Sequence, residues 1–148
     1  MDSDDTHALF DAALDVATRQ AEQHTDSEGV GAAALTDDGM VLTGVWVEAM
    51  VDSACLCAET GPIAEARRTG RKLTASICVR WTQASGASVL AACGVCQERL
   101  AVFGSEMLIG VADPDAPGFR FRPLAELRPS PWWESVESKW NNSQHLAP

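Results

Sequence analysis

Three cysteines constrain the fold of this chain more than any other feature of its sequence. Cys57 begins one stretch of helical pattern, and the motif Cys93-Gly94-Val95-Cys96 begins another. Each stretch is followed by a glycine, Gly70 or Gly104, at the position of a helix C-cap. Cys93 and Cys96 are three residues apart at a helix start, so their side chains face the same side. If one metal ion binds all three sulfurs, two helix N-termini must meet at one point.

The remainder of the chain alternates helical and extended patterns. We predict a helix at residues 6–23 and two strands at 30–36 and 40–47, joined by an Asp37-Asp38-Gly39 turn. Helices at 57–68 and 93–103 alternate with buried strands at 73–81 and 107–112, and residues 83–88 form a turn. A tail rich in proline and tryptophan is expected from about residue 114. This order predicts a single domain spanning residues 1–148, a three-layer α/β/α sandwich with a central mixed sheet.

Charge and composition narrow the class of partner. The chain has 148 residues and a formal net charge of -10, which repels a nucleic-acid backbone and an anionic membrane surface. No apolar run is long enough to span a bilayer, and acidic residues follow Met1 where a signal peptide has basic ones. We therefore expect a cytoplasmic protein that acts on a small molecule, without nucleic acid or membrane as partner. The alternative interpretation of the negative charge is that it serves solubility alone.

The cysteine spacing favours metal chemistry. Five cysteines is an odd number, and in a reducing compartment closely spaced cysteines more often bind metal or act in catalysis than form disulfides. A catalytic zinc takes three protein ligands and keeps one position open, and Cys57, Cys93 and Cys96 supply that number. Glu59, two residues after Cys57, is near enough to move protons without ligating. Taken alone, the Cys93–Cys96 pair is equally compatible with a redox pair or a structural zinc site.

The other cysteines and the histidines receive no ligand role. Cys55 and Cys78 are interpreted as small buried hydrophobic residues, because Cys55 as a fourth ligand would close the metal site. The histidines lie in a terminus, a link and a tail: His7, His24 and His145.

Several motifs, in one order, resemble the cytidine deaminase family, including its blasticidin S deaminase branch. They are Val30-Gly31-Ala32-Ala33, Asp38-Gly39, Thr43-Gly44, Val47-Glu48, Cys57-Ala58-Glu59 and Cys93-Gly94-Val95-Cys96. The general zinc-deaminase signature is a His or Cys ligand, one residue, Glu, and later Pro-Cys-x-x-Cys. This chain fits that signature except at Ala92, which replaces the proline.

The resemblance implies a zinc-dependent hydrolytic deaminase. Cys57, Cys93 and Cys96 would hold the zinc ion, and Glu59 would be the catalytic proton shuttle. The resemblance also implies a homotetramer, or less often a homodimer, with sites at subunit boundaries. The tail places Trp132, or alternatively Trp133, where the family has an aromatic ring that closes over a neighbouring subunit's pocket; both tryptophans could instead anchor the tail in an interface.

Substrate recognition is where the chain departs from the family. Glu48 and Ala58 match expected substrate contacts, but Trp46 stands where the family has an Asn that binds ribose, and Glu28 replaces an aromatic residue that packs on the pyrimidine. A core tryptophan and a solvated glutamate are the plain alternatives for these two. Thr60 and Gln97 replace arginines that follow the two metal motifs, so the helix N-termini or Arg99 must offset the thiolate charge.

Two functions follow from these observations. The first is deamination of a cytosine nucleoside or a related amino-heterocycle, with a nucleoside-like small molecule of specialised structure as the substrate. The second is a non-catalytic, zinc-stabilised binding or assembly module that kept the same fold.

Overall fold

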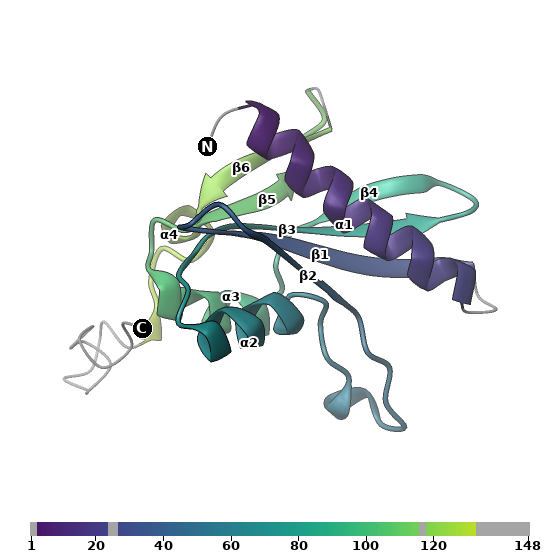
Figure 1. The fold of residues 1–148 in the computed structure, drawn as a ribbon, viewed down its shortest axis with the longest axis horizontal. Helices are drawn as coiled ribbons and strands as arrows, with labels where there is room; N and C mark the ends of the chain where they lie inside the picture. Colours follow the sequence, from purple (N-terminus) through teal and green to yellow (C-terminus); the bar gives the residue numbers. More distant parts are fainter. Residues whose placement is uncertain (1–2, 24–26, 116–117, 133–148) are drawn as a thin grey trace.

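The computed structural model describes residues 3–23, 27–115 and 118–132 (Figure 1). The α-helices are α1 (Ser3–Gln23), α2 (Thr60–Thr69), α3 (Gly94–Leu100) and α4 (Leu124–Leu127). The strands are β1 (Glu28–Thr36), β2 (Val41–Val45), β3 (Leu73–Thr82), β4 (Gly86–Leu90), β5 (Leu108–Ala112) and β6 (Phe119–Pro123). Two short 3-10 helices occupy Asp52–Ala54 and Ala101–Phe103.

The strands form one mixed sheet. Its order is β2-β1-β3-β5-β6, and β4 pairs with the later half of β3. β3 and β5 run parallel, at Ala75↔Leu108 and Ser76↔Ile109, whereas the remaining strand pairs of the described residues are antiparallel. The crossover from β3 to β5 contains α3, so this helix starts near the end of β4 on one face of the sheet.

Helices cover both faces of the sheet and give two separate cores. α1 crosses one face, where Leu9 and Ala13 pack with Ala33, Ile77 and Phe119. These α1 positions repeat every four residues through Ala17 and Ala21, and all four are buried. On the opposite face α2 and α3 lie side by side and bury a second cluster (Figure 1), which holds Ala34, Ala66, Leu73, Cys96, Leu100 and Ile109. The predicted three-layer α/β/α sandwich is therefore confirmed.

Two segments differ from the expectation. Residues 86–90, part of which we expected to be a turn, pair with β3 as β4, and residues 119–127, expected in the tail, form β6 and α4. Both strands are short, and the β6 sequence Phe119–Pro123 alternates large and basic residues without an apolar run. Pairing with an already formed neighbour decides such segments, and local pattern does not.

Element ends agree closely with the sequence pattern. Gly39 and Gly70 adopt positive φ angles of 82° and 69°, as the hairpin turn and the helix C-cap require. α2 begins at Thr60 rather than at Cys57, so Cys57 and Glu59 lie in the turn before it. No helix among the described residues is long and apolar enough to cross a membrane, and the cytoplasmic location stays a prediction. His24, Trp133 and His145 lie outside the described residues.

Candidate metal centre and active site

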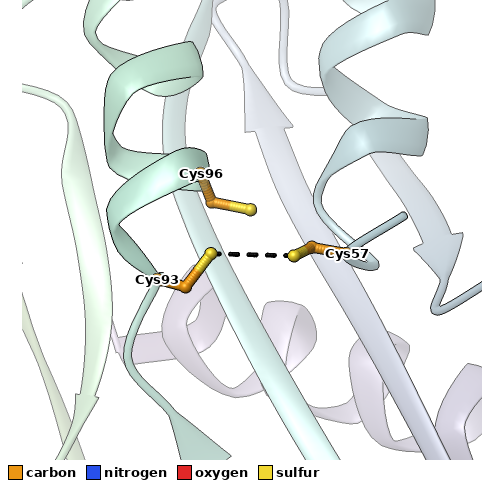
Figure 2. A group of neighbouring side chains, drawn as sticks. All are labelled: Cys57, Cys93 and Cys96. Atoms are coloured by element: carbon orange, nitrogen blue, oxygen red, sulfur yellow. Dashed lines mark hydrogen bonds between the residues drawn. The ribbon is translucent and has the colours of Figure 1, made fainter. Parts of the chain in front are cut away.

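The sulfur atoms of Cys57, Cys93 and Cys96 converge at one point between α2 and α3 (Figure 2). All three lie within 4.8 Å of one another, and the Cys57 and Cys93 sulfurs are 3.6 Å apart. Two thiolates bound tetrahedrally to one zinc ion at about 2.3 Å are about 3.8 Å apart. The three side chains therefore have the chemistry and the spacing of a three-thiolate zinc site.

Close packing of backbones positions the turn that carries Cys57. A Cβ atom added at Gly44 of β2 would lie 2.4 Å from the Ala58 carbonyl oxygen, so only glycine allows this approach. The Thr60 N–H donates to the Cys57 carbonyl at 2.9 Å, which closes the turn into α2. Glu59 is at the helix start and is 4% exposed. The turn therefore aims a thiol and a carboxyl group into the same space.

The start of α3 positions the other two sulfurs. Cys93 is the N-cap, with extended backbone (φ -67°, ψ 166°), and Cys96 is fully buried on the first turn. The Gln97 side-chain amide donates to the Ala92 carbonyl at 2.8 Å, and the Gln97 N–H donates to the Cys93 carbonyl at 2.8 Å. Gln97 thereby holds the approach to the helix, where Ala92 lacks the backbone restriction of a proline.

Environment affects the three thiols differently. Burial opposes ionisation of Cys93, but hydrogen bonds from the Cys96 and Val95 backbone N–H groups and from neighbouring thiols lower its pKa overall. Burial raises the pKa of Cys57, with the Cys93 thiol adding to the effect. Burial also raises the pKa of Cys96, together with the negative charge of Glu59. The start of α3 therefore favours the thiolate form of Cys93, whereas burial disfavours it at Cys57 and Cys96.

A cavity of about 310 Å³ opens beside the sulfurs. One end is formed by Cys57, Ala58, Glu59 and Cys93. Glu28, Val30, Trp46, Cys78, Leu90 and Ala91 also line the cavity, and we call Glu28 and Trp46, which lie at the ends of β1 and β2, the strand-end wall. Glu59 thus faces a space large enough for a small molecule, next to the site where the sulfurs gather.

Comparison with known proteins agrees with this arrangement. The sequence profile of the cytidine and deoxycytidylate deaminase zinc-binding region matches residues 3–111. The chain belongs to this deaminase family. The cytidine deaminase of Mycobacterium tuberculosis is 42% identical over 102 residues, which cover 68% of this chain and 69% of that protein. Family membership identifies the chain as a hydrolytic deaminase.

Solved deaminase structures share the fold. The crystal structure of the cytidine deaminase from Bacillus anthracis superposes with a TM-score of 0.76 at 33% identity, covering 95% of this chain and 96% of that one. That of the Mycobacterium tuberculosis enzyme gives a TM-score of 0.68 at 35% identity, covering 86% and 97%.

Glu28 lines the cavity as part of an ion pair. The Arg80 Nε and Nη2 atoms donate to its two carboxylate oxygens at 2.5 and 2.9 Å. Hydrogen bonding from Arg80 lowers the pKa of Glu28, against a smaller opposing effect of burial. In the strand register Arg80 lies opposite Val30, so the Glu28–Arg80 ion pair runs diagonally from β1 to β3. Glu28 is therefore ionised but compensated, and it is not a free acceptor for a cationic substrate.

Trp46 also lines the cavity, and α1 fixes its backbone. The Gln20 side chain donates to the Trp46 carbonyl at 2.5 Å and accepts from the Val30 N–H at 2.9 Å. The Trp46 N–H donates to the Val30 carbonyl at 3.0 Å. The backbone of Trp46 is thus fixed beside the cavity that this residue lines.

The other predicted substrate residues lie differently. Ala58 lines the cavity, whereas Glu48 is exposed and is not among its lining residues. Trp132 is 52% exposed and donates to Glu98 of α3 at 3.0 Å, away from the cavity of its own chain. The roles of Glu48 and Trp132 toward substrate stay predictions.

The two remaining cysteines are separate from the sulfur cluster. The Cys55 sulfur accepts from the Ala49 N–H at 3.4 Å, and Cys55 is not one of the three converging sulfurs. Cys78 is buried in β3, as expected, but it also lines the cavity, and burial raises the pKa of its thiol strongly.

Sequence reasoning missed three residues that shape this site: Arg80, Gln20 and Cys78. Two of them act through a partner distant in sequence, since Arg80 reaches Glu28 across strands and Gln20 reaches Trp46 from α1. The β-rich pattern at 73–82 was the available signal, because Cys78 and Arg80 are two residues apart on one strand and so project from the same face.

Proposed function

We propose that the chain is a zinc-dependent hydrolase that removes the amino group from a cytosine nucleoside or a closely related amino-heterocycle. The observation that carries the proposal is the convergence of three sulfurs beside a cavity that Cys57, Cys93 and the buried Glu59 line. When bound by Cys57, Cys93 and Cys96, zinc would supply a Lewis acid that lowers the pKa of water and makes a nucleophile available near neutral pH.

Glu59 carries the protons in this proposal. Its carboxylate takes a proton from the attacking water and delivers it to the ring nitrogen, and then assists departure of the amino group as ammonia. A carbon–oxygen bond forms and the exocyclic carbon–nitrogen bond breaks. Glu59 is 4% exposed, which excludes bulk water from competing for the same proton.

The substrate is proposed to be a specialised one. Trp46 and Glu28, which is paired with Arg80, form the strand-end wall of the cavity, where the family resemblance leads us to expect a small amide and an aromatic ring. A nucleoside whose sugar or ring substituent complements a bulky indole and a fixed ion pair would fit this wall, and plain cytidine would fit it less well. The blasticidin S branch remains one candidate of this kind.

We further propose that the active form is a homo-oligomer, a tetramer or a dimer. The segment after β2 exposes apolar side chains, among them Met50 at 101% and Val51 at 59%, and it extends away from the sheet (Figure 1). Trp132 is 52% exposed as well. A second copy of this chain would remove this apolar surface from water. Sedimentation at micromolar concentration tests the proposal, and a monomer across that range contradicts it.

One experiment tests the catalytic proposal directly. We expect protein purified without chelators to hold about one zinc ion per chain, and to release ammonia from at least one member of a panel of cytidine, deoxycytidine, cytosine, blasticidin S and aminopurines. Zinc without turnover of any compound would instead support the non-catalytic module. Substoichiometric zinc after careful purification would contradict the metal site itself.

A further inference from the structure

The thiolate cluster carries excess negative charge. Three thiolates around a dication leave about -1, and the Glu59 carboxylate in the same cavity adds to it. Such charge in a partly buried place needs nearby donors or cations. The Cys96 and Val95 backbone N–H groups at the start of α3 provide part of this.

Arg99 of α3 contacts the segment next to the turn that carries Cys57. It lies one turn after Cys96 on α3, is half-buried, and its Nη1 donates to the Thr60 Oγ1 at 2.9 Å. Within the described part of the chain Arg99 forms no ion pair with a carboxylate. By contrast, the arginines that do pair with carboxylates include Arg68, Arg71 and Arg80. Among the described residues the side-chain contact of Arg99 is therefore with the helix start that follows Cys57 and Glu59.

Thr60 connects Arg99 to Cys57, the candidate metal ligand in the turn before α2. The Thr60 N–H donates to the Cys57 carbonyl at 2.9 Å, and Thr60 follows Glu59 directly. The contact therefore ties α3, which carries Cys93 and Cys96, to the turn that carries Cys57. An Arg guanidinium has a rigid, planar set of donors, which suits it to hold a hydroxyl at one place.

We propose that Arg99 is a positioning residue of the zinc site, which acts through Thr60 to hold Cys57 at the correct spacing from the two cysteines of α3. The inference rests on the proposed function, because it concerns the affinity of the three cysteines for zinc. It assigns no contact with substrate to either residue.

Zinc affinity, measured by competition with a chromogenic chelator, tests the role of this contact. Thr60→Val removes the hydroxyl at nearly constant volume, and Arg99→Met removes the donor; we expect each to weaken zinc binding about tenfold or more. Thr60→Ser keeps the hydroxyl and should restore affinity close to that of the unchanged protein. Arg68→Met, on an exposed part of α2, removes the same charge and serves as the control.

Further measurements separate this role from general stability. The double variant should weaken binding no more than the stronger single variant, because both changes break one contact. The cobalt(II)-loaded Thr60→Val protein should show shifted thiolate absorption bands, which a distant loss of stability would not produce. Equal zinc affinity in Thr60→Val and in the unchanged protein would overturn the inference while leaving the metal site standing. An unchanged protein that binds no zinc would overturn the proposed function first, and the inference with it.

Discussion

The sulfur end and the strand-end wall of the cavity are held in place in different ways. At the sulfur end, Cys57 and Glu59 lie in a turn pressed against β2, and Cys93 and Cys96 begin a helix, so backbone geometry sets every functional group. At the strand-end wall, Glu28 and Trp46 depend on side-chain partners, Arg80 and Gln20.

The sulfur end also carries the Cys-Ala-Glu and Cys-x-x-Cys motifs of the family resemblance, whereas at the strand-end wall that resemblance leads us to expect residues other than Trp46 and Glu28. A metal site tolerates little change, because ligand number and spacing are set by the ion. A wall that contacts only the substrate can change one side chain at a time while the ligands and the proton carrier stay in place. The contrast suggests that the reaction and the choice of substrate are determined by separate parts of this molecule.

The largest expected effect is a loss of kcat after a change at the sulfur end that leaves the metal ligands in place. Glu59→Gln should keep zinc and the fold but lower kcat by roughly 10²-fold or more, because the amide cannot carry a proton between water and the ring. Activity assays beside metal analysis measure this. Glu65→Gln, on the exposed side of α2, makes the same change in charge and should leave activity unchanged. Full activity in Glu59→Gln would show that another group moves the proton.

A smaller effect, on kcat/KM for cytidine, is expected from changes at the strand-end wall. Trp46→Asn combined with Glu28→Phe restores the residues that the family resemblance leads us to expect, and should raise kcat/KM for cytidine on the order of tenfold. Trp46→Phe, which keeps a large ring, is the control and should give no such gain. The unchanged protein should turn cytidine over weakly, below about 10⁴ M⁻¹s⁻¹. Efficient turnover of cytidine by the unchanged protein would contradict the specialised substrate and leave the deaminase function intact.

The smallest expected effect concerns the ion pair of the wall. Arg80 lowers the folded-state pKa of Glu28 below its usual value of 4.5, so the pair stabilises the folded state above that pH, and the contribution is lost as the pH falls through the folded-state pKa. Glu28→Gln should therefore be slightly less stable than the unchanged protein at neutral pH, and the difference should vanish in acid. The effect is small because both partners are 42% exposed and screened by solvent.

Urea denaturation at several pH values measures that difference. Glu22→Gln, at an exposed position on α1, provides the control. A difference that persists unchanged in acid would show that Glu28 stabilises the fold through packing, without a contribution from its charge.

The catalytic half of the site was accessible from local sequence. Two short segments contain its functional residues, Cys57 and Glu59 in the first and Cys93 and Cys96 in the second. The three-residue spacing of Cys93 and Cys96 already sets both sulfurs on one side of a helix. The wall was accessible only in part. Trp46 and Glu28 were candidates by position alone, while Arg80 could not be named, because its partner is 52 residues away in the sequence.

The sequence by itself determined α1, α2 and α3, the hairpin and the residues capable of binding metal, because these follow from periodicity, turn residues and spacing within a few positions. Only the tertiary structure decided that β4 and β6 join the sheet, that Glu28 is neutralised by Arg80, and that Arg99 reaches Thr60 across two helices. Such contacts depend on strand register and helix packing. Those are set by the burial of both faces of the sheet at once, and no local pattern contains them.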